Sequence, residues 1–147
     1  TAGRWMLSLP LKSVNNLVKD ARKVQQTILM VGDISDIYVT NFNTMTGDPN
    51  FTVEELSAIA FGYNRLLKES SDLLLDLKEV TTATGLSMTD KERLDIINRI
   101  YGEVLEYKNL TWYYTRKNIG VSYLRSKEKG DAARVLSLYG THEQRYW

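Results

Sequence analysis

Cysteine is absent from this sequence, and histidine occurs once, at His142. Without cysteine the chain can form no disulfide, no thiolate nucleophile and no cysteine-ligated metal site. One histidine cannot supply a three-ligand catalytic metal centre, and nucleophiles that need a histidine base have almost no partner here. The glycines stand singly, so no glycine-rich phosphate loop is present. We therefore expect a protein that is not an enzyme, with no catalytic residue, no cofactor and no bound metal ion.

Proline and long apolar runs are scarce as well. Only Pro10 and Pro49 occur, and nearly a hundred residues follow Pro49 without a helix breaker of this kind. The uninterrupted apolar runs are only a few residues long, which predicts no transmembrane helix. What the chain does contain, 43% hydrophobic and 25% charged residues, is ordinary for a soluble globular protein. This composition is typical of helices.

Apolar residues recur every three or four positions along most of the chain, which is the periodicity of a helix with one buried face. The first series, starting near Ser13, contains Val14, Leu17, Ala21, Val24, Ile28, Val31, Tyr38, Phe42 and Met45. A turn at residues 47–50 separates it from the second, which contains Leu56, Ile59, Tyr63, Leu66, Ser70, Leu73, Leu77 and Val80. We expect Ile28 and Leu66 to be buried in these two helices.

Two helix starts carry a capping box, in which a threonine and a glutamate three residues later bond each other's backbone amides. These pairs are Thr52 with Glu55 and Thr89 with Glu92. Phe51 and Leu56 add a hydrophobic staple to the first pair. A stop at Gly85 ends the second helix, and we expect Asn118 and Gly120 to end or bend the third.

The last predicted helix is short. Asp131 is its expected N-cap, Val135 and Leu138 form its buried edge, and Gly140 stops it. The predicted fold is all-α, an elongated antiparallel bundle of three long helices with a short C-terminal helix. We expect residues 1–12 to be an irregular segment or a vector or processing remnant, and residues 13–147 to be a single helical bundle domain.

A series of carboxylates invites a metal-site interpretation, with Asp72, Asp76 and Glu79 in the second helix. Di-iron bundles place Glu-x-x-His pairs inward on facing helices, and no such pair exists here. These three acids flank Lys68 and Lys78 on the face opposite the leucines. We interpret them as a solvated face.

Aromatic and basic residues gather toward the end of the chain. Seven of nine tyrosines and two of three tryptophans fall from Tyr101 onward, and from Lys108 to Trp147 there are eight basic residues against three acidic ones. Such a mixture can bind single-stranded nucleic acid by stacking and phosphate contacts. It can equally cover the end of the bundle or contact another protein, and the near-zero net charge favours this second interpretation. The candidate partner contacts are Trp112, Tyr123, Tyr139, Tyr146 and Trp147.

Five stretches of the sequence resemble one known family. They are VNNLVKDARKVQQTI (14–28), EELSAIAFGY (54–63), LSMTDKER (86–93), YTRKNIGVSYLRSK (114–127) and EQRYW (143–147). They are similar to the TraI-type conjugal transfer proteins of Bacteroides conjugative transposons, and the resemblance spans roughly residues 13–147. It does not extend to the relaxase-helicase of F-type plasmids that shares the name, because one histidine and no nucleotide-binding loop argue against that activity.

The resemblance implies a component of a conjugative, type IV secretion-like apparatus that is exported by a signal peptide and works in the periplasm or cell envelope. The family's signal peptide has no counterpart in residues 1–11. The family offers no catalytic motif to carry over. The expected function is that of a structural or adaptor subunit that contacts other subunits of the apparatus, with homo-oligomerisation left open. The alternative is a nucleic-acid-contacting transfer protein that uses the basic aromatic region; a helical regulator of the envelope is a third option.

Overall fold

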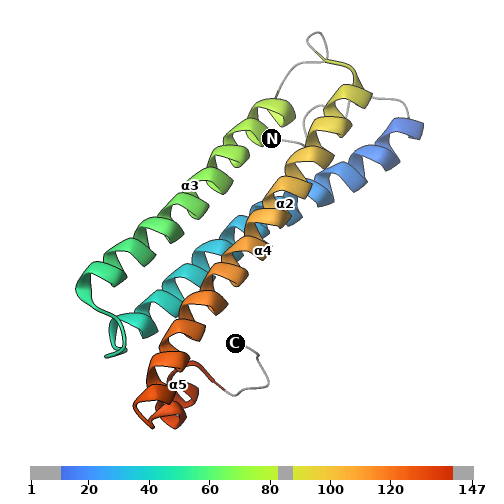
Figure 1. The fold of residues 1–147 in the computed structure, drawn as a ribbon. Helices are drawn as coiled ribbons and strands as arrows, with labels where there is room; N and C mark the ends of the chain where they lie inside the picture. Colours follow the sequence, from blue (N-terminus) through green and yellow to red (C-terminus); the bar gives the residue numbers. More distant parts are fainter. Residues whose placement is uncertain (1–10, 83–87, 141–147) are drawn as a thin grey trace. The chain divides into compact units, whose positions relative to one another are not determined.

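The structure is a computed structural model that describes residues 11–82 and 88–140, with side chains from residue 19 onward. It contains four helices, α2 (Leu11–Thr46), α3 (Val53–Thr82), α4 (Asp90–Glu128) and α5 (Ala132–Tyr139) (Figure 1). No strand occurs in these described ranges. The all-α prediction is confirmed. Gly85, His142, Tyr146, Trp147 and the segment before Leu11 lie outside the described residues.

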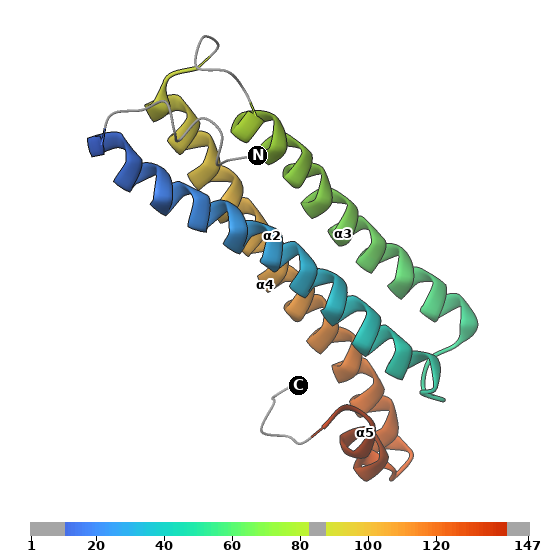
Figure 2. The same cartoon turned by 180° about the vertical axis from the view of Figure 1, so that it is seen from behind.

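The chain divides into two compact units, each of which contains a segment of α2, of α3 and of α4 (Figure 2). The first unit contains the part of α2 up to Gly32, together with Lys68–Tyr107. The second contains Asp33–Leu67 and the chain from Lys108 onward, including α5. Each unit is described by its own contacts.

The predicted turn and the capping box that follows it are confirmed. Gly47 and Asp48 donate their amides to the carbonyls of Thr44 and Met45 at 3.1 and 3.0 Å. The Thr52 amide donates to Glu55 Oε1 at 3.0 Å, and the Glu55 amide donates to Thr52 Oγ1 at 3.1 Å. Because both orphan amides find a partner, α3 begins directly after the turn.

The predicted register of α2 is wrong at Ile28, whose side chain is 51% exposed. The buried residues around it include Thr27, Met30, Ile34 and Ile37, which the predicted series did not contain, and Val31, which it did. Thr27 is fully buried, and its hydroxyl is satisfied by donating to the Lys23 carbonyl at 2.7 Å, so a polar residue occupies a core position that an apolar count omits. Leu66, the other expected core residue, is half-buried.

Helix α4 does not end at Asn118 and Gly120, as the prediction allowed, but continues to Glu128. The Asn118 side chain donates to the carbonyl of Tyr114 at 2.9 Å and so bonds within the helix instead of stopping it. A single internal glycine costs only about 1 kcal/mol relative to alanine. The fully buried Ile119 and Ser122 on either side of Gly120 offset that cost through their packing. The last helix lies where it was predicted, with Val135 buried and Gly140 at its end with φ of 105°. Asp131 precedes it, but its side chain makes no capping hydrogen bond and pairs with Arg134 at 2.9 Å.

In the first unit the core lies where α2, α3 and the start of α4 meet. Ile97, Ile100 and Val104 are fully buried on α4, and Leu77 is 2% exposed on α3. Arg93 is also buried and donates to the Val80 carbonyl, which ties α4 to α3.

The second unit has an aromatic core. Its buried cluster consists of Met45, Phe51, Ile59, Tyr63, Ile119, Val135 and Tyr139. The Tyr63 ring stacks on Tyr38 at 4.7 Å between centroids and meets Tyr114 edge-on at 5.0 Å. Its hydroxyl shares a 2.6 Å hydrogen bond with Thr115, and burial raises the pKa of Tyr63 to about 12. Residues of all four helices therefore meet in this one cluster.

Candidate interaction surface

The face of α4 that points into the second unit is built mainly from small polar residues. Thr111, Thr115, Ser122 and Ser126 are all fully buried. The hydroxyls of the last three are occupied. Thr115 Oγ1 bonds the Thr111 carbonyl at 2.8 Å, and the side-chain amide of Asn50 donates to Ser122 Oγ and Ser126 Oγ at 3.1 and 2.6 Å. These bonds remove the cost of burying polar groups, so hydroxyls can occupy core positions.

The opposite face of the same segment is apolar and exposed. Leu110, Tyr113, Val121 and Leu124 are 46%, 51%, 39% and 60% exposed. With the exposed Lys117 between them, their spacing of three, four, four and three residues places them on one face of the helix. These five residues form what we call the α4 stripe. A surface helix normally has the reverse arrangement, with the apolar residues inside.

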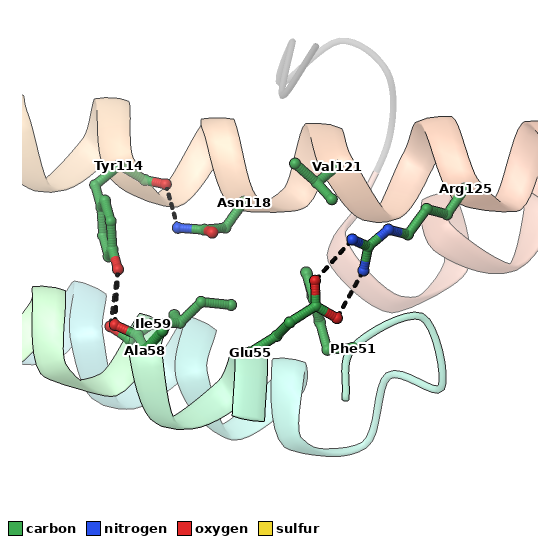
Figure 3. A pocket seen from close by; sticks show the side chains of 8 residues that line it. All are labelled: Phe51, Glu55, Ala58, Ile59, Tyr114, Asn118, Val121 and Arg125. Atoms are coloured by element: carbon green, nitrogen blue, oxygen red, sulfur yellow. Dashed lines mark hydrogen bonds and ion pairs between the residues drawn. The ribbon is translucent and has the colours of Figure 1, made fainter. Parts of the chain in front are cut away.

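A pocket of about 310 Å³ lies between α3 and α4 in the second unit and adjoins the stripe at Val121. Phe51, Ala58 and Ile59 give it an apolar lining on the α3 side. Figure 3 shows Tyr114 and Arg125 reaching from α4 towards α3 at its two ends, with Val121 between them. The pocket therefore combines apolar walls with two polar ends, which is the usual make-up of a binding cleft.

Tyr114 bounds one end of the pocket through a close approach to α3. Its hydroxyl donates to the Ile59 carbonyl at 3.0 Å and lies above Gly62, at which a Cβ atom would overlap it. Burial raises the pKa of Tyr114, so it stays a neutral donor at physiological pH.

The other end is bounded by the ion pair of Arg125 and Glu55. The guanidinium holds both carboxylate oxygens, at 2.8 and 2.7 Å, and also donates to the Asn50 carbonyl at 2.7 Å. The hydrogen bonds from Arg125 and from the Thr52 amide lower the pKa of Glu55 to about 2. Glu55 thus caps α3 and binds α4 with the same carboxylate.

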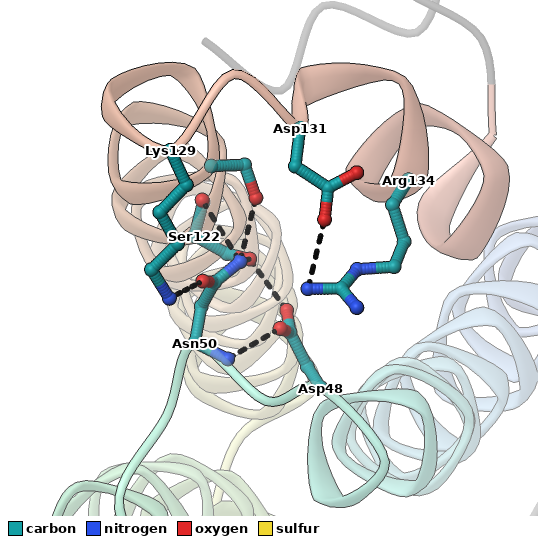
Figure 4. A network of polar contacts seen from close by, with 7 residues as sticks. Asp48, Asn50, Ser122, Lys129, Asp131 and Arg134 are labelled. Carbon is teal, nitrogen blue, oxygen red and sulfur yellow. Dashed lines mark hydrogen bonds and ion pairs between the residues drawn. The ribbon is translucent and has the colours of Figure 1, made fainter.

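A buried polar network fixes this end of the unit (Figure 4). Asp48 is buried, with 3% of its surface exposed. Its carboxylate accepts hydrogen bonds from the backbone amide of Asn50 at 2.9 Å, from Ser122 Oγ at 2.5 Å and from the Tyr139 hydroxyl at 2.7 Å. Lys129 Nζ donates to Asn50 Oδ1 at 2.7 Å. Burial and the bond to Asp48 raise the pKa of Tyr139. The network joins the turn after α2 to α4 and α5, which is a structural role.

The charge around the stripe is positive. From Lys108 to Glu128, α4 carries five basic residues and one acidic residue. Lys108 and Arg125 are paired with Asp33 and Glu55. Within the described residues no carboxylate pairs with the other three, Arg116, Lys117 and Lys127. Lys117 Nζ lies 5.5 Å from the centre of the Tyr113 ring, a cation–π distance.

The predicted contact residues have different positions. Tyr139 is buried in the core cluster, and Tyr123 is half-buried against it, so both belong to the chain's own packing. Trp112 is half-buried on α4, and its role as a partner contact stays a prediction. Tyr146 and Trp147 lie outside the described residues. Sequence reasoning missed Leu110, Val121 and Leu124 as a surface, although the spacing of three or four residues along the stripe was a usable signal.

The described residues give no grouping of three or more histidine, aspartate or glutamate side chains suited to a metal ion. Asp72, Asp76 and Glu79 are exposed, and Asp72 pairs with Lys68 at 2.8 Å, as expected for a solvated face. In the same part of the chain, each helix is too polar or too short to cross a bilayer. The chain matches no protein-family model, no curated protein and no solved structure.

Proposed function

We propose that this chain is a non-enzymatic structural or adaptor subunit that works through protein–protein contacts. The observation that carries the proposal is the inverted polarity of α4 in the second unit, where four hydroxyl residues are buried with Ile119, and Leu110 and Leu124 are exposed. Leaving leucines in water gives up burial free energy of about 25 cal/mol per Å². A partner that covers the stripe would recover this burial free energy, so the exposed leucines are explained if the chain works in an assembly.

The resemblance to the TraI-type family gives the setting of the proposal. It points to the conjugative DNA transfer apparatus of the cell envelope, where other subunits of that apparatus would be the partners. The periplasm or envelope is accordingly the proposed location.

We further propose that the three long helices form an elongated antiparallel bundle. In the second unit Glu55 pairs with Arg125 and Tyr63 pairs with Thr115, so a higher residue number on α3 goes with a lower one on α4. In the first unit Glu69 pairs with Tyr107 and Val80 pairs with Arg93, which is the same order. These pairings support an antiparallel arrangement of α3 and α4 within each unit.

A second candidate function, contact with single-stranded nucleic acid, is favoured by the excess of basic residues on α4. Stacking on Tyr113 and phosphate contacts from Arg116, Lys117 and Lys127 would carry it. The exposed leucines have no part in such binding, which is why the protein-contact function ranks first.

Conjugation efficiency decides between the two. We expect the variant Leu110→Ser/Leu124→Ser to transfer poorly while it keeps the helical circular-dichroism signal. Leu75→Ser is the control, because Leu75 is 62% exposed but lies in the other unit. If Arg116→Gln/Lys127→Gln abolishes transfer and flattens the salt dependence of oligonucleotide binding, while the leucine variant transfers normally, the nucleic-acid function holds instead.

A further inference from the structure

We infer that the partner of the α4 stripe is an acidic amphipathic helix of another protein, which lies along the stripe and inserts an apolar side chain into the pocket between Tyr114 and the Arg125–Glu55 pair. This inference rests on the proposed function and adds the chemistry of the partner to it.

The spacing of the stripe calls for a helix. Leu110 and Leu124 are four helical turns apart, about 21 Å along the axis. Knobs at intervals of three and four residues fit the holes of another helix, whereas an extended strand would present side chains at a period of two.

The pocket gives this helix an anchor point. Val121 belongs both to the stripe and to the pocket wall, so a helix seated on the stripe would lie beside the pocket. One large apolar side chain would contact Phe51 and Ile59 there, and the fixed positions of Tyr114 and Arg125 limit how far the helix can slide. Anchors of this type dominate the energy of helix-in-groove interfaces.

Charge selects an acidic partner. Lys117 stands at the midpoint of the stripe, seven residues from both Leu110 and Leu124. Arg116 and Lys127 follow Tyr113 and Leu124 by three residues, so they flank the side of the stripe away from the pocket. Carboxylates beside the partner's apolar seam would meet these three cations.

The same placement disfavours a second copy of this chain on the stripe. In either a parallel or an antiparallel pairing of two identical stripes, Lys117 would face Lys117 of the copy. Like charges brought together in an interface repel each other and disfavour such a partner.

A synthetic helical peptide of about three heptads tests the inference. In each heptad the acidic peptide carries leucine at the two seam positions, a and d, and glutamate at the flanking positions, e and g. The basic control peptide is identical except that lysine replaces glutamate. Fluorescence anisotropy with the full chain should show the acidic peptide binding at least about tenfold more tightly than the basic one, a difference of about 1.4 kcal/mol. Val121→Ser should weaken binding of the acidic peptide, and Leu75→Ser should not. Lys117→Glu should reduce the preference for the acidic peptide.

Equal binding of the two peptides, or no binding of either, overturns the acidic partner. A dimer in light scattering that dissociates on Leu124→Ser would show that a second copy occupies the stripe, and this also overturns it. In each of these cases the proposed function stands if Leu110→Ser/Leu124→Ser still impairs transfer. The proposed function fails, whatever the peptides show, if that variant transfers as wild type does.

Discussion

The hydroxyl group of Tyr114 occupies the position that the Cβ atom of any other residue at Gly62 would need. Helix α3 therefore contains a glycine in its interior, where alanine would be the better helix former, because the α4 side chain crosses it at this point. The two residues together fix the spacing of α3 and α4 beside the pocket.

We expect Gly62→Ala to lower the free energy of unfolding by about 1–3 kcal/mol, since Tyr114 must move away from Ile59 and from the Tyr63 ring. Urea unfolding measures this. Gly102→Ala is the matched control, because nothing lies within 4 Å of a Cβ atom there. That change should stabilise the protein by about 1 kcal/mol through helix propensity.

Combining the glycine change with Tyr114→Ala separates steric overlap from other causes. In the Tyr114→Ala background, Gly62→Ala should become stabilising, like Gly102→Ala. A Gly62→Ala change that remains destabilising in this background would contradict the overlap as its cause.

Tyr139→Phe removes one of the three hydrogen bonds to the buried Asp48 carboxylate. We expect a loss of about 1–3 kcal/mol in the free energy of unfolding, because a hydrogen bond to a buried charged group is lost. Tyr113→Phe, at an exposed tyrosine of the same unit, should stay within about 0.5 kcal/mol. Similar effects of the two changes would mean that the bond to Asp48 contributes little.

The Arg125–Glu55 pair predicts an acid-dependent loss of stability. The pKa of Glu55 is lowered from 4.5 to about 2 in the folded protein, so the stabilisation is complete above about pH 4.5 and is lost as the pH falls towards 2. Chemical denaturation at several pH values should show a smaller decline across this window for Glu55→Gln than for wild type. Identical slopes would contradict the depressed pKa.

The observed register of α2 can be tested with the same substitution at two isoleucines. Ile34→Ala should cost about 2–5 kcal/mol, because Ile34 is fully buried. Ile28→Ala should cost no more than about 0.5 kcal/mol, as expected for a surface position. Thermal or urea unfolding of the two variants gives the comparison. A larger effect at Ile28 would restore the register expected from apolar spacing.

The helix starts could be predicted because their determinants are local. Thr52 and Glu55 are three residues apart, and each needs only the other's backbone amide. The register of α2 and the continuation of α4 depend instead on distant partners. Thr27 becomes a core residue through packing against other helices, and nothing in its own sequence neighbourhood indicates that it is buried.

The candidate surface shows the same limit more strongly. An argument from polarity places Leu110 and Leu124 inside and Thr111 and Ser122 outside, and the structure has the opposite arrangement. The reason lies in residues far along the chain: Asn50 and Asp48 satisfy the Ser122 hydroxyl across 72 and 74 residues. Such compensation cannot be seen from α4 alone.

The Asp48 network also has a consequence for the order of folding. Its carboxylate is bonded by Ser122 and by Tyr139, 74 and 91 residues further along the chain. During synthesis the turn after α2 emerges long before either hydroxyl, so Asp48 must stay hydrated until α4 and α5 arrive. Contacts of such long sequence separation form late and slowly. This end of the second unit should therefore close only in the last step of folding.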